Sequence, residues 1–208
     1  METAILIGAI VAWGAIHSWL ASLAAKGIWR RFLGAPGSRA YRLGYNAWAL
    51  VSFIPVLWLM RVLPDRVLYF VGVPWRYVMI AGEIAAACLL FLAVLPTDPL
   101  HFAGVRQLLQ DDVPPRLVTD GFYQWVRHPL YLFGLLILWL SPLMTINVLT
   151  VISGLTAYVF IGARFEEQRL LREFGEDYRA YRERTPMLIP WLRSRRTEEG
   201  RTRPTSKR

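Results

Sequence analysis

Long apolar runs separated by short polar segments dominate the pattern of this 208-residue chain. Four runs are almost free of charged side chains and cover residues 4–25, 43–60, 77–97 and 129–163. Only the third contains a charge, that of Glu83. A helix needs about 20 apolar residues to cross the core of a bilayer. The pattern therefore predicts an integral membrane protein.

The fourth run is too long for a single crossing, because a rise of about 1.5 Å per residue would extend it to roughly 50 Å. Ser141 and Pro142 lie near its middle, and proline lacks the amide donor that continues a helix. We therefore predict a turn there, with arms at residues 129–140 and 144–161. Together with the three earlier runs, this gives an all-α fold of five transmembrane helices, the last two forming a helical hairpin.

Basic residues near the ends of the runs predict the orientation of the chain. The first loop contains Lys26, Arg30, Arg31, Arg39 and Arg42, whereas the second contains Arg61, Arg66 and Arg76. We expect the first loop to be cytoplasmic, which puts the N-terminus outside and the C-terminus in the cytoplasm. No basic residue precedes the first run, so we interpret it as a retained helix; cleavage near residues 22–25 is the alternative.

The polar parts of the chain are too short to build a second domain. We expect a single membrane domain at residues 1–190, with its catalytic half at residues 98–190. Residues 98–128 and 164–190 would pack over the helices as a cytoplasmic lid. The basic tail at residues 191–208 has almost nothing apolar to bury, which predicts disorder.

Composition narrows the partners and the compartment. The net charge of +9 and the pI of 10.2 arise beside helix ends and in the tail, where anionic lipid headgroups explain them. We therefore expect a lipid bilayer, and no nucleic acid, as the partner. Cys88 is the only cysteine, so neither a disulfide nor a cysteine metal site is available, and we expect no metal. The cysteine-poor, short-looped layout fits a bacterial inner membrane.

The most informative chemistry lies at residues 121–134, where Arg127, His128 and Pro129 precede the first arm of the hairpin. Proline suits the first position of a helix, and the free amides there, with a neighbouring cation, form an anion site. Tyr131 would add a hydroxyl to the same crevice. The alternative is that Arg127 and His128 only anchor the helix end among lipid headgroups.

Two carboxylates, Glu166 and Glu167, follow the other end of the hairpin. Because the two ends of a hairpin lie close together, we expect these carboxylates to face Arg127 and His128. The charges could then hold an amino acid moiety, with its carboxylate at Arg127 and its ammonium, or ribose hydroxyls, at Glu166. The alternatives are a salt bridge between Arg127 and one glutamate, or pairing of the glutamates with arginines of their own helix.

An ordered series of residues in the C-terminal half resembles a known family. The series comprises Leu117, Val118, Thr119, Gly121, Tyr123, Arg127, His128, Pro129, Tyr131, Gly134, Glu166, Glu167, Leu170, Phe174, Gly175, Tyr178, Tyr181, Pro186 and Pro190. It is similar to the isoprenylcysteine carboxyl methyltransferase superfamily. Further matches, to its branch of bacterial methanethiol S-methyltransferases and nitrogen-oxide-response membrane proteins, are His17, Ser18 and residues 39–42, 101–107, 142–145 and 186–190.

The resemblance implies a methyltransferase that binds S-adenosylmethionine under the lid. It implies cofactor contacts from Gln107, Leu117, Val118, Tyr123, His128, Tyr131, Glu166 and Glu167. It also implies His128 and Arg127 as catalytic residues. Prenylcysteine enzymes have an arginine that helps the acceptor carboxylate at the place where this chain has Gly162. Methylation of a prenylcysteine is therefore disfavoured.

Methyl transfer from a sulfonium is an in-line displacement that needs no protein nucleophile, so positioning supplies most of the rate. Aromatic faces such as those of Tyr123 and Tyr131 attract a sulfonium. If the acceptor is a thiol, His128 or His101 can accept its proton, although a thiol beside a sulfonium can also ionise without a dedicated base.

We favour methyl transfer to a small or lipid-like acceptor, with a methanethiol-like thiol first. The alternative enzymatic functions are carboxyl methylation of an isoprenylcysteine-type acceptor and methylation of a phospholipid amine. A non-catalytic transport or sensing protein on the same scaffold is the alternative of another class, and a reductase on a similar scaffold is a third. Inside the membrane helices, we favour a packing hydrogen bond for His17 and a snorkelling or paired role for Glu83 over roles in a site.

Overall fold

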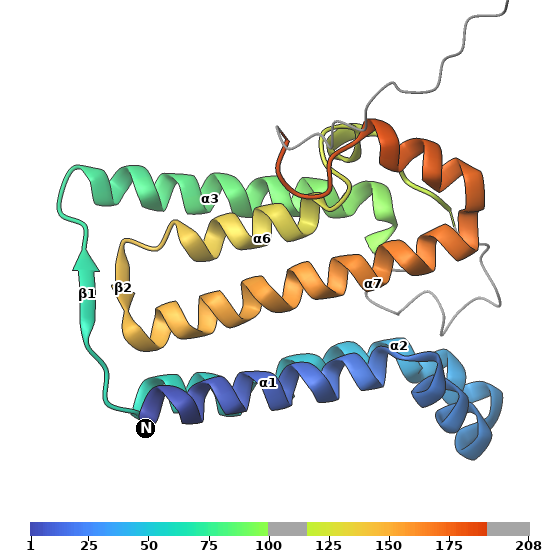
Figure 1. The fold of residues 1–208 in the computed structure, drawn as a ribbon, viewed down its shortest axis with the longest axis horizontal. Helices are drawn as coiled ribbons and strands as arrows, with labels where there is room; N and C mark the ends of the chain where they lie inside the picture. Colours follow the sequence, from blue (N-terminus) through green and yellow to red (C-terminus); the bar gives the residue numbers. More distant parts are fainter. Residues whose placement is uncertain (100–115, 191–208) are drawn as a thin grey trace, which may run out of the picture.

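The helices run side by side along the length of the molecule (Figure 1) in the computed structural model, which describes residues 1–99 and 116–190. Four are long and apolar enough to cross a membrane: α1 (Glu2–Ala21), the Ala40–Val62 part of α2 (Leu23–Val62), α3 (Trp75–Val94) with the 3₁₀ turn η1 (Leu95–Thr97), and α7 (Ile146–Arg184). The apolar helix α6 (Pro129–Trp139) is shorter, with 11 residues. These helices fit an integral membrane protein. The predicted tail, His101 and Gln107 lie outside the described residues.

Ser22 separates α1 from α2, because its extended backbone (φ −70°, ψ 157°) ends one helix and begins the next. Its hydroxyl accepts a hydrogen bond from the amide of Ala25 (3.2 Å) and so caps α2. Within α2, Gly34 has φ 64° and ψ −160°, a conformation that favours glycine and divides the helix in two. Helix α2 therefore begins well before the predicted apolar run at residues 43–60, since much of the basic first loop is also helical.

A two-stranded antiparallel sheet connects the two turns at the end of the molecule that also holds the N-terminus (Figure 1). Strand β1 (Val67–Phe70) pairs with β2 (Leu143–Thr145). The apolar pattern predicts an all-α fold, so this sheet was not expected from the sequence. The chain does reverse at Ser141 and Pro142, as predicted, and the Pro142 carbonyl accepts a hydrogen bond from the chain just after β1 (2.9 Å).

Buried Asn147 ties the start of α7 to the end of α2. Its side-chain amide donates to the carbonyls of Met60 (3.3 Å), Leu63 (3.2 Å) and Pro64 (3.4 Å). Its backbone amide donates to Oδ1 of Asp65 (3.0 Å). Carbonyls at a helix end have no partner within the helix, so these bonds both satisfy the end of α2 and fix the position of α7 beside it.

Helix α1 packs against α2 and α7, and α6 packs mainly against α3. Four buried side chains form a core where α1, α2 and α7 meet: Leu6, Ile10, Val56 and Val151. A Cβ atom at Gly154 would lie only 2.8 Å from Cγ2 of Ile10. Glycine at this position therefore lets α1 and α7 approach closely, as small residues do between membrane helices.

Helix α7 continues far beyond its charge-free part, which ends at Ala163. The polar residues that follow extend the same helix to Arg184, with a break at Gly175 (φ 53°, ψ −122°). The second arm of the hairpin is therefore one continuous element with part of the predicted lid. This extension carries both glutamates of the candidate site on a regular helix.

Candidate functional site

The start of α6 meets the polar part of α7 and the segment after it. The backbone amides of Arg127 and His128 donate to the carbonyls of Pro186 (2.9 Å) and Met187 (3.2 Å). These bonds fix the two residues just before α6 against the segment that follows α7. The side chains of the same two residues reach α7 itself, so the predicted approach of the two hairpin ends is confirmed.

The guanidinium of Arg127 bonds to α7 and to the residue that follows it. Its Nε donates to Oε1 of Glu167 (2.7 Å), and its Nη1 donates to the carbonyls of Arg182 (2.9 Å) and Thr185 (2.6 Å). Both side chains of the ion pair are largely buried, at 11% exposed for Arg127 and 9% for Glu167. The salt bridge that the sequence analysis kept as an alternative is therefore present, and it fastens α6 to α7.

His128 lies between the two carboxylates of α7. It occupies the N-cap position of α6, followed by Pro129 at the first helical position, and its side chain is 6% exposed. Its Nε2 is 3.2 Å from Oε1 of Glu167, and its Nδ1 is 3.7 Å from Oε2 of Glu166. The imidazole is thus fixed in orientation and connects the two glutamates.

Glu166 has the more open carboxylate of the two, with 34% of its side chain exposed. The hydroxyl of Tyr131 donates to its Oε2 (2.8 Å). The ring of Tyr131 stacks on that of His128, with centroids 5.3 Å apart and planes 8° apart. The cluster therefore joins a phenol, a buried imidazole and a partly exposed carboxylate.

Glu167 carries a stable negative charge although it is buried. It lies on the polar part of α7, beyond Ala163. Burial opposes its ionisation, but hydrogen bonds from His128 and Arg127, with the charge of Arg127, outweigh burial and lower its pKa below the ordinary 4.5. The ion pair with Arg127 is therefore intact at neutral pH.

Three further predicted residues lie on the chain that leads to α6. Leu117 and Val118 are half-buried in a segment without regular secondary structure, and Tyr123 lies in the 3₁₀ helix η2 (Gly121–Gln124). Burial, with a smaller contribution from the carboxylate of Glu166, raises the pKa of Tyr123 to about 12. This phenol therefore stays neutral at pH 7 and belongs to the electrostatic surroundings of the cluster.

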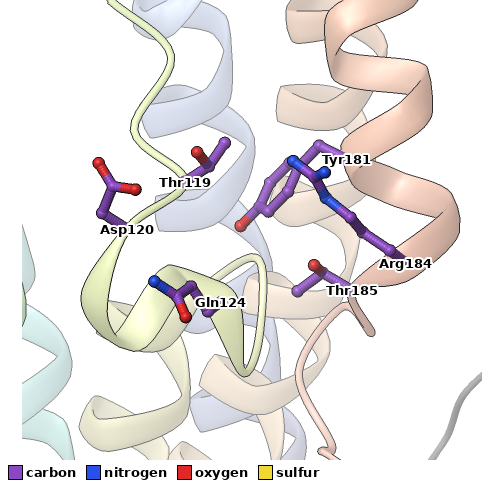
Figure 2. A pocket seen from close by; sticks show the side chains of 6 residues that line it. All are labelled: Thr119, Asp120, Gln124, Tyr181, Arg184 and Thr185. Atoms are coloured by element: carbon purple, nitrogen blue, oxygen red, sulfur yellow. The ribbon is translucent and has the colours of Figure 1, made fainter.

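An open pocket of about 370 Å³ borders the cluster (Figure 2). Two facing segments form its walls, one at η2 and one at the end of α7, through Thr119, Asp120, Gln124, Tyr181, Arg184 and Thr185. The hydroxyl of Tyr181 donates to the carbonyl of Tyr123 (2.6 Å) and so joins the two walls. His128, Tyr131 and Glu166 do not line this pocket, which is therefore a neighbour of the cluster and not its centre.

Several contacts of the cluster come from residues that the sequence analysis did not assign to the site. Arg182 and Thr185 act through backbone carbonyls, for which a sequence carries no residue-specific signal. Tyr45 and Tyr158 lie within electrostatic range of Tyr131, although they belong to α2 and α7. Their approach depends on how three helices pack, which no local pattern reveals.

Comparison with known proteins gives consistent matches. Residues 79–185 match the model of a family described as a protein of unknown function, DUF1295. Methanethiol S-methyltransferase 1 of Bradyrhizobium diazoefficiens is 31% identical over 183 residues, which cover 86% of this chain and 63% of that protein. The methanethiol S-methyltransferase of Crocosphaera subtropica is 31% identical over 206 residues, covering 92% and 77%. Protein-S-isoprenylcysteine O-methyltransferase of Xenopus laevis is 26% identical over 167 residues, covering 76% and 54%.

No solved structure matches the chain. The helices and the curated relatives together define a class, that of membrane-embedded methyltransferases. The chain belongs to the isoprenylcysteine carboxyl methyltransferase superfamily, in which its matches at 31% identity are methanethiol S-methyltransferases. It spans 63% of the length of the Bradyrhizobium relative and 77% of the Crocosphaera relative.

Proposed function

We propose that this protein transfers a methyl group from S-adenosylmethionine to a small thiol at the membrane. The proposal depends on the cluster of His128, Tyr131 and Glu166, which joins an imidazole, a phenol and a partly exposed carboxylate at the ends of two helices. Relatives named methanethiol S-methyltransferase support a thiol as the acceptor. When bound, S-adenosylmethionine supplies an electrophilic methyl group on a sulfonium.

The membrane arrangement that we propose has five crossings, with α6 as the fourth. Helix α6 has 11 residues and covers about 16 Å, and the chain that follows it to β2 extends this length. The N-terminus would lie outside, and residues 98–128 and 164–190 would form a cytoplasmic lid. In this orientation the cluster opens to the cytoplasm, where S-adenosylmethionine is available.

Glu166 is the residue that we assign to the polar groups of the donor. Its contacts within the described part of the chain, from Tyr131 and His128, both use Oε2. We assign Oε1 to hydrogen bonds from ribose hydroxyls or an ammonium group of the donor. A carboxylate oriented by a phenol and partly exposed to solvent fits such a ligand.

The other predicted residues receive different roles. We assign Arg127 and Glu167 to positioning, because Nε and Nη1 of Arg127 fasten α6 to Glu167 and to two backbone carbonyls, and Glu167 holds both Arg127 and the imidazole. His128 would contact the donor and order the site, since it is held between both carboxylates. The remaining donor contacts that we propose, following the family resemblance, are Gln107, Leu117, Val118 and Tyr123.

Calorimetry with purified protein and S-adenosylmethionine tests the donor site. We expect Glu166→Ala and His128→Ala to weaken binding at least tenfold, which is about 1.4 kcal/mol. Glu176→Ala is the matched control, because this carboxylate lies on the same helix and is 80% exposed. A flat titration of the wild-type protein, or equal affinities for the Glu166→Ala and Glu176→Ala variants, would overturn the assignment.

An acceptor assay with a radiolabelled methyl donor tests the second half of the proposal. Methanethiol, a prenylcysteine analogue and a lipid extract would be offered separately. We expect label in the thiol, and little in the prenylcysteine because Gly162 stands where prenylcysteine enzymes have an arginine. Faster methylation of the prenylcysteine than of any thiol would contradict the proposed acceptor.

A further inference from the structure

A polar and aromatic cluster lies inside the helix bundle, separate from the contacts just described. It is built around His17 on α1, whose Nε2 is hydrogen bonded to the hydroxyl of Tyr45 on α2. The ring of Trp13 stacks on His17, with centroids 5.0 Å apart. Tyr158 on α7 lies edge-on to the same imidazole at 5.8 Å. Three membrane helices thus converge on one histidine.

The second nitrogen of this histidine, Nδ1, is buried, and the part of the chain that the structure describes supplies no hydrogen-bond partner for it. A buried polar atom without a partner costs free energy, and native proteins satisfy nearly all such atoms. An ionisable residue within a membrane helix is in addition a candidate for function. An atom of this kind is explained if it serves a ligand.

The position of the His17 cluster relates it to the donor site. On α7, Tyr158 precedes Glu166 by eight residues, which is about 12 Å along the helix. Tyr131, whose hydroxyl bonds to Glu166, lies within electrostatic range of both Tyr158 and Tyr45. Along α7, the His17 cluster therefore lies on the side of the proposed donor site that faces the charge-free part of the helix.

We propose that the His17 cluster is the acceptor site, and that His17 accepts the proton of a small neutral thiol that enters from the bilayer. This inference rests on the proposed methyltransferase function. It requires the tautomer in which Nε2–H donates to the hydroxyl of Tyr45, so that Nδ1 presents a lone pair. The imidazole is then oriented by a second group, as a general base must be.

The surroundings of His17 select the acceptor by size and charge. The rings of Tyr45, Trp13 and Tyr158 have their centroids 4.7 to 5.8 Å from that of His17. Rings at these distances are in contact, so only a small group can reach Nδ1. The walls are aromatic, so a neutral thiol is admitted, whereas a charged acceptor would pay a large desolvation cost.

The proposed reaction is a displacement at the methyl carbon of the donor. The thiol proton passes to Nδ1 of His17, and the sulfur electron pair forms the new bond to the methyl carbon. The bond between that carbon and the donor sulfonium breaks, and its electron pair returns to the donor sulfur, which becomes a neutral thioether. The products are a methyl thioether and a protonated imidazole, which later loses its proton. No oxidant or metal takes part.

Kinetics of the His17→Gln variant provide the first test. We expect its affinity for S-adenosylmethionine to match the wild type, while kcat/KM for methanethiol falls at least about 100-fold at pH 7, as for loss of a general base. The deficit should persist at higher pH, where the thiol ionises in solution (about 8.5 for cysteine), because the aromatic walls disfavour entry of the charged form. Within the described residues, the titratable groups in contact with His17 are Tyr45 on α2 and Tyr158 on α7, and tyrosine ordinarily stays neutral below about pH 10.

Nuclear magnetic resonance supplies a readout that does not depend on activity. The chain has three histidines, so ¹⁵N-histidine labelling gives a spectrum that variants can assign. Ethanethiol added without donor should shift the Nδ1 resonance of His17 and leave that of His128 in place. Thr156→Val is the matched control within the membrane, because Thr156 bonds to Trp139, away from the cluster; its kinetics should match the wild type.

The outcomes separate this inference from the proposed function. Two results would overturn the acceptor site while leaving the proposed methyltransferase function valid. One is wild-type kinetics in the His17→Gln variant, and the other is a wild-type protein in which ethanethiol does not shift the Nδ1 resonance of His17. A wild-type protein that binds no donor and methylates no thiol would instead overturn the function. If His17→Gln misfolds and so fails to bind the donor, the Tyr45→Phe variant tests the proposal, because it keeps the ring and removes only the hydroxyl. A drop of about tenfold in kcat/KM supports the proposal, and an unchanged kcat/KM contradicts it.

Discussion

Substitution of Arg127 by methionine should release the segment after α7 from the start of α6. The guanidinium donates three hydrogen bonds, one to Glu167 and two to the carbonyls of Arg182 and Thr185, from a side chain that is 11% exposed. A hydrogen bond with a charged partner contributes about 1.5–3 kcal/mol. Because Glu167 keeps its contact with His128 and methionine keeps much of the aliphatic packing, we expect a loss of about 3 kcal/mol, on the order of a hundredfold in an equilibrium.

Hydrogen exchange measures this release directly. The backbone amides of residues 127 and 128 are bonded to the carbonyls of Pro186 and Met187, so they exchange only when those bonds open. In Arg127→Met they should exchange about a hundredfold faster, whereas amides within α3 should not change. Arg179→Met is the control, because its ion pair with Glu176 is 59% and 80% exposed and such pairs contribute little. If amides 127 and 128 of Arg127→Met stay as protected as in the wild type, the assigned positioning role is refuted.

Three further predictions concern stability in detergent, measured by thermal unfolding. The pKa of Glu167 is lowered in the folded protein, so the ionised carboxylate contributes fully to stability above the unfolded pKa of about 4.5, and this contribution is lost as the pH falls through the folded pKa. The difference in Tm between the wild type and Glu167→Gln should therefore narrow on acidification. A difference in Tm that stays constant would contradict this expectation. Asn147→Leu leaves the carbonyls at the end of α2 unsatisfied and should cost about 2–3 kcal/mol, several degrees in Tm, whereas an unchanged Tm would be inconsistent with the observed bonds. Gly154→Ala puts a Cβ 2.8 Å from Ile10 and should cost about 1–3 kcal/mol; adding Ile10→Ala should recover part of the loss, and its failure to do so would show that the clash is not with that side chain.

The membrane helices could be predicted from the sequence because a span depends on length and absence of charge, which are local properties. The turn at Ser141 and Pro142 was accessible for the same reason. The two-stranded sheet could not be predicted from the sequence, because β1 and β2 are short and lie far apart in the chain. Their pairing depends on the end of α2 lying level with the start of α7, which Asn147 and its bonds to the carbonyls at the end of α2 fix.

The sequence predicted which residues form the candidate site and that they lie close together. It did not predict which of them pair with one another. Arg127 had two adjacent glutamates within reach, and the sequence does not reveal which one it binds. The structure shows that Glu167 pairs with Arg127, while Tyr131 bonds to Glu166. The carbonyls that complete the hydrogen bonding of Arg127 belong to the backbone, so no side-chain pattern announces them.

Adjacent carboxylates can take separate roles because consecutive residues of a helix point about 100° apart. Glu167 points inward, where its carboxylate accepts hydrogen bonds from Arg127 and His128. Its charge therefore holds α6 against α7. Glu166 remains partly exposed and is oriented by Tyr131. Tyr131 in turn lies within electrostatic range of the tyrosines around His17. One phenol thus stands between a polar surface suited to a charged methyl donor and an apolar interior suited to a neutral thiol. Bringing two substrates of such different polarity together requires a site at this boundary, which a helix hairpin with a polar extension provides.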